Sequence, residues 1–435
     1  MSFARPLRHS QFRRVWFGQA ISSIGDGIFA VALIGLILQS HRNSDLGYVM
    51  AAEGAAMVAM SLVGGVLADR MRRSRAMALS EMVRLLAVTG FVLGAAQGPL
   101  ILSLVLAAMM GAGAALFQPA FGALTPSLVP DEDLPAANAL RSMTTRAAAV
   151  IGPALGGLLL ALSGPRMALL VDVATFAVSV LFLIGIKDRA PQRDTPQNVF
   201  REAHAGLSAV AARPWVLTII LQGTVQLLLV MGPALVLLPI LLKDRGHFAA
   251  YGVMVGLQAL GSVLGGLTVS AYQPRQPGVA GVCALALLSL QLLALGLDLP
   301  LYVLGATMVA TGFGYSVFGV LWSSALQRSI PGELLGRVMS VEMLGTFALA
   351  PVGLALAPLA ITAWGTQPVL LGALVVLLVS TVLPLAQRDV RRFADTAPPA
   401  DAATGIRDAD PGDDDTADDA DEPATRRPVA RTEPS

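Results

Sequence analysis

Several residue types on which soluble enzymes depend are rare in this chain. Cysteine occurs once in 435 residues, as Cys283, which excludes an intramolecular disulfide and a cysteine metal site. Only two of the 30 cationic residues are lysines, Lys187 and Lys243, and neither follows a glycine, so the chain has no G-x-x-x-x-G-K-[ST] phosphate loop. The four histidines lack metal-ligand spacing, and H-E-x-x-H and G-x-S-x-G are absent. We therefore predict no cofactor, no metal and no enzyme activity.

Charge is scarce as well. Only 14% of the residues are charged and 55% are hydrophobic, whereas a soluble globular protein carries about 25% charged residues. A water-soluble core could not bury that much apolar surface, so most of the chain is expected to lie in lipid. Residues 1–386 carry a net charge of +7 and residues 387–435 a net charge of −6. This change of sign marks a boundary between a basic body and an acidic tail.

The apolar residues fall into stretches of roughly 20 residues, the length that crosses a bilayer. Twelve such spans are predicted, divided six and six by the long connection 187–214. They cover residues 15–39, 46–68, 76–96, 100–122, 137–162, 167–186, 215–242, 250–271, 278–297, 300–324, 338–362 and 367–386. The first is too long for the apolar core of a signal peptide and contains Asp26, so we interpret it as an uncleaved helix.

Arginine and lysine lie mostly on one side of these spans. With the N-terminus inside, 19 loop cations fall on the cytoplasmic side, and four fall on the other side. Those four are Arg42, Arg166, Lys243 and Arg245. The positive-inside rule therefore places both termini in the cytoplasm of a bacterial inner-membrane protein.

Four regions are predicted from these patterns. An N-terminal six-helix bundle covers residues 1–190 and a C-terminal six-helix bundle covers residues 215–390. The cytoplasmic loop at residues 191–214 is predicted to contain an amphipathic helix at Val199–Arg213. The acidic tail at residues 391–435 is rich in Asp, Ala and Pro and is predicted to be disordered.

A constant offset of 201 residues relates the two halves. It pairs Ser61, Gly64 and Gly65 with Ser262, Gly265 and Gly266, and it pairs Gly111, Gly113 and Phe117 with Gly312, Gly314 and Phe318. Parallel repeats of six spans are typical of transporters in which two bundles rock around a central site. The predicted fold is therefore an all-α membrane protein of twelve transmembrane helices in two parallel six-helix repeats.

A motif follows the second span. The run Gly65–Arg75 reads GVLADRMRRSR and resembles the signature of the major facilitator superfamily. The resemblance implies a cytoplasmic gate formed by Gly65, Asp69, Arg70 and Arg73. The superfamily pattern has a glycine where this chain has Arg72.

The fifth span contains a second motif, Gly152-Pro153-Ala154-Leu155-Gly156-Gly157. It is similar to the glycine–proline core of the antiporter motif, and its small residues Gly152, Pro153, Gly156 and Gly157 also suit plain helix packing. The stretches Leu7–Asp26, Phe117–Gly157 and Gln327–Ser340 resemble the branch of macrolide-efflux permeases and the enterobactin exporter. Many drug–proton antiporters carry an arginine where this chain has Ala107, so that coupling residue is not carried over.

Ionisable residues inside the spans are the candidates for coupling to protons or substrate. An ionised side chain at mid-bilayer costs about 2.5–3.5 kcal/mol on insertion scales, so each one needs a reason. The candidates are Asp26, Glu53, Glu81, Arg84, Asp172 and Glu342.

These candidates differ in their alternative explanations. Glu81 and Arg84 are three residues apart and share a helix face, which also fits a local ion pair. Asp172 lies close enough to Arg166 for a snorkelling pair. The other two glutamates, Glu53 and Glu342, are placed where water can reach them. Each fits a functional role and simple exposure to water equally well.

Uncharged polar residues are predicted to line a cavity. Gln19, Ser22 and Asp26 form one polar stripe on the first span, where the alternative is an interhelical hydrogen bond. Gln222 and Gln226 lie one turn apart on the seventh span and are either cavity residues or interhelical contacts. Gly232-Pro233 is predicted to kink that span.

The predicted function is that of a secondary active transporter working by alternating access. We expect proton-coupled efflux of small lipophilic organic compounds, in the antibiotic or siderophore class, by a monomer in the lipid bilayer. Multidrug resistance by antiport fits this prediction, and no nucleic-acid partner is expected. An importer or a lipid flippase on the same fold is the alternative, and a non-transporting scaffold or sensor is a third.

Overall fold

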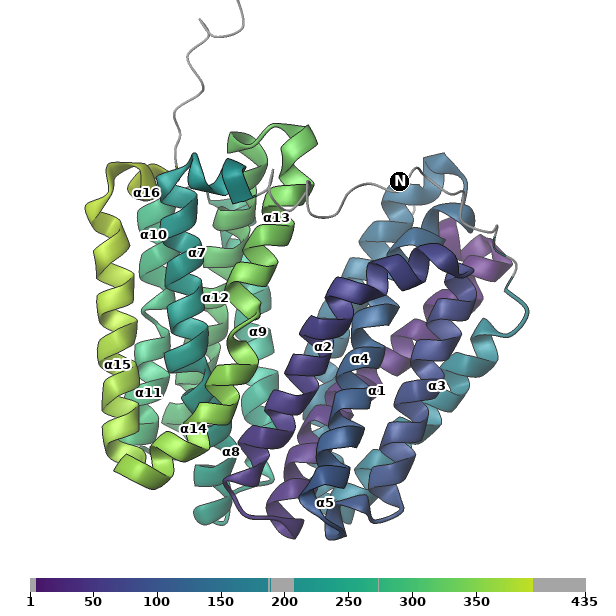
Figure 1. The fold of residues 1–435 in the computed structure, drawn as a ribbon, viewed down its shortest axis with the longest axis horizontal. Helices are drawn as coiled ribbons and strands as arrows, with labels where there is room; N and C mark the ends of the chain where they lie inside the picture. Colours follow the sequence, from purple (N-terminus) through teal and green to yellow (C-terminus); the bar gives the residue numbers. More distant parts are fainter. Residues whose placement is uncertain (1–4, 187, 189–206, 273, 394–435) are drawn as a thin grey trace, which may run out of the picture. The chain divides into compact units, whose positions relative to one another are not determined.

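The computed structural model describes residues 5–186, 188, 207–272 and 274–393. Within these ranges the chain is helical and contains no strand. The first group of helices consists of α1 (Ser10–Ser40), α2 (Asp45–Arg70), α3 (Arg73–Val92), α4 (Leu100–Leu124) and α5 (Leu134–Leu183), which form one bundle (Figure 1). Short 3₁₀ turns cover Arg5–Arg8, Ala95–Gln97, Thr125–Ser127, Asp131–Asp133 and Leu383–Ala386.

The second bundle contains the remaining helices. They are α7 (Pro214–Gln226), a π-helical turn at Leu227–Met231, α8 (Gly232–Asp244), α9 (Ala250–Ala271), α10 (Pro277–Leu285), α11 (Leu288–Gly296), α12 (Leu301–Ser329), α13 (Gly332–Phe347), α14 (Ala350–Trp364), α15 (Thr366–Val382) and α16 (Arg388–Arg392). The predicted amphipathic helix Val199–Arg213 and the predicted tail fall largely outside the described residues.

Some predicted spans are divided or joined in the structure. The fifth and sixth spans run through α5, which bends at Gly164, where φ is 79° and the backbone is not helical. The seventh span is α7, the π turn and α8 in succession, and the ninth span is α10 followed by α11. The eleventh span is α13 followed by α14. Read in this way, the helices agree with the twelve predicted spans, and the all-α prediction is confirmed.

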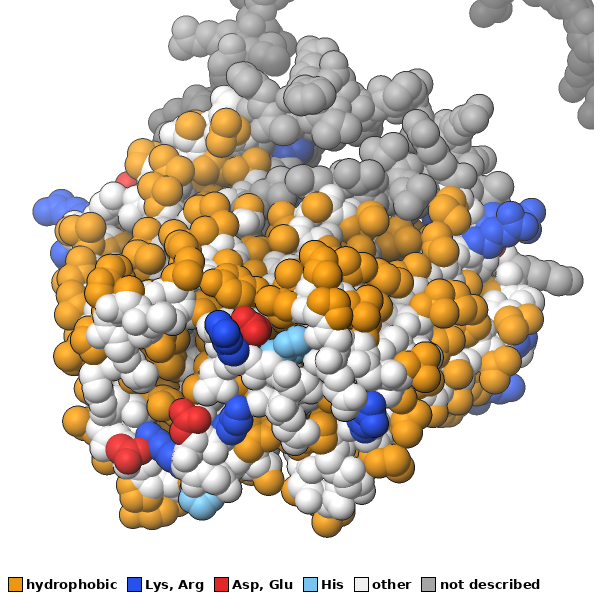
Figure 2. Space-filling model, turned by 60° about the horizontal axis from the view of Figure 1, so that its bottom comes forward, with side chains coloured by type: hydrophobic (Ala, Val, Ile, Leu, Met, Phe, Trp, Pro, Cys, Tyr) orange, Lys and Arg blue, Asp and Glu red, His pale blue; other side chains and the backbone are white. Residues whose placement is uncertain are grey.

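Eight segments of the described chain are long and apolar enough to cross a membrane by length and composition. Large hydrophobic side chains that a soluble protein would bury are exposed on these and neighbouring helices, for example Leu86 at 56% and Val375 at 59%. Figure 2 shows the same distribution, with hydrophobic side chains along the flanks and charged side chains gathered on the end face turned forward. This is the distribution expected of a protein whose flanks contact lipid.

One close helix crossing occurs in both bundles, at positions that differ by the offset of 201 residues. A β-carbon at Gly152 of α5 would lie 2.9 Å from the Cα atom of Gly27 in α1. In the second bundle, a β-carbon at Gly353 of α14 would lie 2.5 Å from the carbonyl oxygen of Leu228. Since 27 and 152 become 228 and 353 under the offset, both bundles contain the same close crossing at the same repeat position.

The bundles pack directly against each other where α2 contacts α14 and where α5 contacts α9. Gly157 of α5 and Gly252 of α9 approach so closely that a β-carbon at Gly157 would lie 2.9 Å from the Cα atom of Gly252. A cation reinforces the junction, because Lys243 Nζ at the end of α8 donates to Leu38 O at 2.5 Å and to Asn43 Oδ1 at 3.0 Å. Lys243 thus caps the last turn of α1 from the opposite bundle.

Candidate functional site

Three carboxylates from three helices of the first bundle meet around one arginine. Arg84 of α3 forms an ion pair with Asp26 of α1. Its Nη1 atom lies 3.6 Å from Glu81 Oε1, one helical turn away. Asp172 of α5 interacts electrostatically with the same guanidinium. We call Asp26, Glu81, Arg84 and Asp172 the Arg84 cluster.

The Arg84 cluster corrects one interpretation of the sequence. The alternative to a coupling role for Asp172 was a snorkelling pair with Arg166, but in the structure Asp172 interacts electrostatically with Arg84. Its Oδ1 atom accepts a hydrogen bond from Thr175 Oγ1 at 3.1 Å, and its Oδ2 atom is buried without a hydrogen-bond partner. Gly25 makes room for this carboxylate, since a β-carbon there would overlap the side chains of Asp172 and Thr175.

The members of the Arg84 cluster differ in their access to solvent. The side chains of Glu81 and Arg84 are 0% and 5% exposed, whereas that of Asp26 is 38% exposed. Ser22 Oγ of α1 donates to both carboxylate oxygens of Glu81, at 3.3 and 3.2 Å. The guanidinium carbon of Arg84 also lies 4.4 Å from the centroid of the Phe176 ring. Asp26 is therefore the member of the cluster that is accessible from outside the protein interior.

Charge balance decides what the Arg84 cluster can do. With every group ionised it holds three negative charges and one positive charge, and burying uncompensated charge in a low-dielectric interior is strongly unfavourable. The cluster becomes neutral if two protons, or other cations, join it. Protonation of Asp26 would remove the ion pair between α1 and α3 and leave Arg84 to Glu81 and Asp172. The arrangement can therefore couple cation binding to the contact between helices.

The other two carboxylates proposed from the sequence lie apart from this cluster. Glu53 is on α2, next to Gly54, where the helix faces Pro351 of the second bundle. Glu342 lies on α13, and its Oε1 atom accepts a hydrogen bond from Trp322 Nε1 at 3.4 Å. The structure does not bring either glutamate to Arg84.

The predicted cavity glutamines occupy different environments. Gln19 Nε2 donates to Ser23 Oγ at 2.6 Å, while Gln19 Oε1 is buried without a partner. Gln226 Nε2 donates to Ser380 Oγ of α15 at 3.0 Å, which is an interhelical contact. Gln222 is 5% exposed, and neither polar atom of its side chain has a hydrogen-bond partner in the described part of the chain.

The gate motif is described only in part. Gly65, Asp69 and Arg70 lie in the last turns of α2, and their side chains fall outside the described residues. Arg73 begins α3 and donates from Nη1 to Ala123 O at 2.7 Å, which ties α3 to the end of α4. The gate role of these residues stays a prediction.

The glycine–proline motif lies where α5 crosses α1 and α9. A β-carbon at Gly152 would lie 2.7 Å from Ile24 O, and one at Gly156 would lie 3.0 Å from Ile28 Cα. Pro153 O approaches Gly252 of α9. The small residues of this motif therefore permit close approach on both sides of α5.

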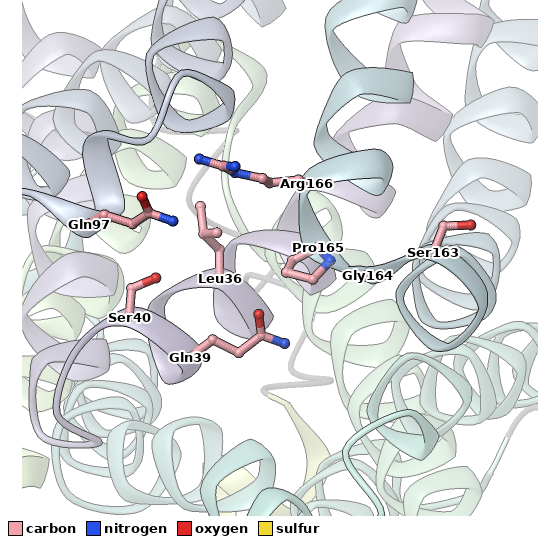
Figure 3. Close-up of a pocket in the computed structure, with 8 residues that line it drawn as sticks. All are labelled: Leu36, Gln39, Ser40, Gln97, Ser163, Gly164, Pro165 and Arg166. Atoms are coloured by element: carbon pink, nitrogen blue, oxygen red, sulfur yellow. The ribbon is translucent and has the colours of Figure 1, made fainter.

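One cavity is lined, apart from Arg166, by residues that the sequence did not single out. It has a volume of about 530 Å³ and is lined by Leu36, Gln39, Ser40, Gln97, Ser163, Gly164, Pro165 and Arg166. Figure 3 shows the Arg166 side chain extending over Leu36 toward Gln97. The cavity lies at the bend of α5, since Gly164 and its neighbours Ser163, Pro165 and Arg166 line it, and a helical pattern alone gives no signal for it. The sequence reading also missed Phe176, whose ring contacts Arg84. It could have been found, because it follows Asp172 by one helical turn.

Sequence relatives agree with this architecture. A family profile described as "Transmembrane secretion effector" matches residues 1–401. The chain belongs to this family of the major facilitator superfamily. It is 30% identical to the enterobactin exporter EntS of Escherichia coli O157:H7 (strain EC4115 / EHEC), in an alignment of 419 residues that covers 91% of this chain and 96% of the exporter. The same name and identity apply to a relative in Shigella boydii serotype 18, over 417 residues with the same coverage.

Solved structures share the fold at low sequence identity. A bacterial homologue of the iron transporter ferroportin in an inward-facing state matches with a TM-score of 0.69 and 17% identity, covering 89% of this chain and 99% of that one. The nucleoside transporter NupG matches with a TM-score of 0.64 and 14% identity, covering 87% and 98%. The chain is therefore a multi-pass inner-membrane protein and a secondary transporter, and the predicted resemblance is confirmed.

Proposed function

We propose that this transporter exports small lipophilic organic compounds, in the siderophore or antibiotic class, in exchange for protons. The observation that carries the coupling is the Arg84 cluster, which holds three carboxylates against one arginine inside the first bundle. Export is favoured because the relatives at 30% identity are named as exporters of enterobactin.

The cluster suggests how a proton would be used. Asp26 is the most exposed carboxylate, so it takes the proton first and releases Arg84 from α1. Arg84 then has Glu81 and Asp172 as its remaining partners. Because Asp26 and Arg84 belong to different helices, their separation and rejoining would bias two arrangements of the bundle.

The direct test is proton movement driven by substrate. The full chain would be reconstituted into liposomes that contain a pH-sensitive dye, and enterobactin would be added as the first probe. Asp26→Asn imitates the protonated carboxylate, so it should bind substrate while proton movement falls by at least about tenfold. Asp45→Asn is the matched control, because Asp45 lies at the start of α2, away from the cluster.

Three results can be separated in this assay. Loss of proton movement with retained binding supports the proposal. Weakened binding with proton movement unchanged would make Asp26 a substrate residue. Full activity driven by the pH gradient in Asp26→Asn would overturn the assignment and move it to Asp172 and Glu53.

We also propose that both termini lie in the cytoplasm. The asymmetry of 19 loop cations against four supports this orientation. Single cysteines placed at Ser10 and at Asn43, in a Cys283→Ser background, should react with an impermeant reagent from opposite sides of the membrane. Labelling of both from the same side would contradict the orientation.

A further inference from the structure

A groove runs between α7 and α15, far from the Arg84 cluster in the chain. It has a volume of about 610 Å³, and apolar side chains make up most of its walls. Leu221 and Val225 come from α7, Leu229 comes from the π turn that follows it, and Val375 and Val379 come from α15. Because these five side chains are between 39% and 59% exposed, the groove opens on the outside of the bundle, where lipid lies.

One polar side chain in the groove is left without a partner. Gln222 lines it and is 5% exposed, and neither its Oε1 nor its Nε2 atom has a hydrogen-bond partner among the described residues. Gln226, one turn further along α7, satisfies its amide by donating to Ser380 and Thr381. A buried amide without hydrogen bonds is unfavourable. The groove therefore offers a donor to a ligand that is apolar along most of its length and carries a carbonyl group.

Basic residues follow the end of the groove in the chain. Gln387 lines it there, and its side chain bonds with Thr218 at 3.0 Å. The next residues form α16, whose exposed side chains include Arg388, Arg391 and Arg392 against one carboxylate, Asp389. Arg391 Nε donates to the carbonyl oxygen of Leu385, the residue that follows the groove-lining Leu383 and Pro384. Basic pockets between membrane helices on the cytoplasmic side attract anionic lipid headgroups.

The order of the polar and apolar groups along the groove matches that of a glycerophospholipid. Gln222 lies one helical turn below Thr218, which is roughly 6 Å along α7. Leu229 lies eleven residues below Thr218, roughly 16 Å along the helix, so the apolar part is long enough for most of an acyl chain. A glycerophospholipid has this order of groups, with phosphate first, ester carbonyls next and the chains below them.

We propose that the groove between α7 and α15 binds an anionic glycerophospholipid of the cytoplasmic leaflet. The phosphate lies beside Arg388 and Arg391, and Gln222 Nε2 donates to an ester carbonyl oxygen. One acyl chain follows Leu221, Val225 and Leu229. Lipid in this position fills the space that separates α15 from the seventh span.

Native mass spectrometry of the full chain in detergent tests this proposal with phosphatidylglycerol and phosphatidylethanolamine as probes. Wild-type protein should retain phosphatidylglycerol at least about fivefold better than phosphatidylethanolamine. Gln222→Leu should weaken the binding of both lipids by about five- to tenfold, since both carry the ester carbonyl. The double variant Arg388→Ser/Arg391→Ser should weaken phosphatidylglycerol alone.

Two further variants keep the test decisive. Val379→Trp fills the groove and should abolish retention of both lipids. Gln291→Leu is the matched control, because Gln291 is 4% exposed, also has a buried oxygen without a partner, and does not line the groove. Each variant would first be shown to elute as a single folded species.

Equal retention of the two lipids by wild-type protein would overturn the proposal, and so would unchanged retention in Val379→Trp. Displacement of phosphatidylglycerol by the transported compound would also overturn it, because the groove would then belong to the transport path. None of these readouts depends on proton coupling, so failure of the export proposal leaves this one testable.

Discussion

The two bundles share their helix crossings but not their chemistry. Shifted by 201 residues, the four members of the Arg84 cluster fall on apolar positions of the second bundle. Asp26, Glu81, Arg84 and Asp172 correspond to Leu227, Val282, Leu285 and Ala373. The crossing of Gly27 with Gly152, in contrast, reappears as the crossing of Leu228 with Gly353.

This difference separates what the fold requires from what transport requires. The second bundle packs the same crossing with apolar side chains, so the charges of the first bundle are not needed to hold the helices together. Each buried charge is unfavourable for insertion, and a group kept in spite of that is expected to have a function. The comparison therefore supports the proposal that proton coupling belongs to the first bundle, and the second bundle is its apolar counterpart.

The largest effect is expected when Arg84 is replaced by leucine, the residue at the equivalent position of the second bundle, Leu285. Arg84→Leu leaves three carboxylates without their cation, and removing one partner of a buried ion pair costs about 3–5 kcal/mol. We expect a large loss of folded protein in a thermal unfolding assay, together with loss of transport. Arg166→Leu is the control, since Arg166 is an exposed arginine of the same bundle outside the cluster.

A combined variant sharpens this result. Arg84→Leu with Asp26→Asn, Glu81→Gln and Asp172→Asn removes all the charges at once, so the folded state should be recovered while proton coupling stays lost. Recovery of coupling in this variant would show that the cluster is structural.

An intermediate and equal effect is expected at the shared crossing. Gly152→Val and Gly353→Val each add a side chain where a β-carbon would already lie 2.7 Å or less from a carbonyl oxygen. Overpacking of this kind costs about 1–3 kcal/mol, so both variants should lower the thermal unfolding temperature similarly. Gly372→Val on α15 is the control, because no heavy atom lies within 4 Å of its added β-carbon. If only one of the two variants lowered the thermal unfolding temperature, the two crossings would not be equivalent.

The smallest effect is expected at the cation that joins the bundles. Lys243→Met removes the hydrogen bonds to Leu38 O and Asn43 Oδ1, which contribute about 1 kcal/mol and so shift the two access states by about fivefold. Distance measurements between spin labels on the two bundles would report the change in population. Arg245→Met is the control, because Arg245 pairs with Asp298 inside the second bundle. Equal shifts in the two variants would argue against a specific role for Lys243.

The helices were largely predictable because each span is a local pattern of the right length. The predicted span 250–271 coincides with α9 (Ala250–Ala271), and the connection predicted after residue 162 contains the bend at Gly164. Interruptions within spans were harder to predict. Gly232-Pro233 signalled a disturbance of the seventh span, but the π turn lies just before it, at Leu227–Met231.

The candidate site was predictable in part, and the limit is physical. Glu81 and Arg84 share a face through their spacing, which is a property of one helix. The meeting of Asp26 and Asp172 at the same guanidinium depends on how three helices pack, and single-helix spacing does not contain that information. Proximity along the chain therefore offered Arg166 as an alternative partner of Asp172, whereas packing brings Asp172 into electrostatic interaction with Arg84.

The π turn has a consequence for the rotation of the seventh span. Such a turn contains one residue more than an α-helical turn at the same place. Because each residue of an α-helix advances the helix by about 100°, deleting one residue from Leu227–Met231 would turn α8 by about that angle against α7. Gly232 would then leave the face that meets Gly353. The π turn thus sets the rotation of α8 relative to α7. Because of it, the seventh span lines the groove with α15 through α7 and meets α14 through Gly232.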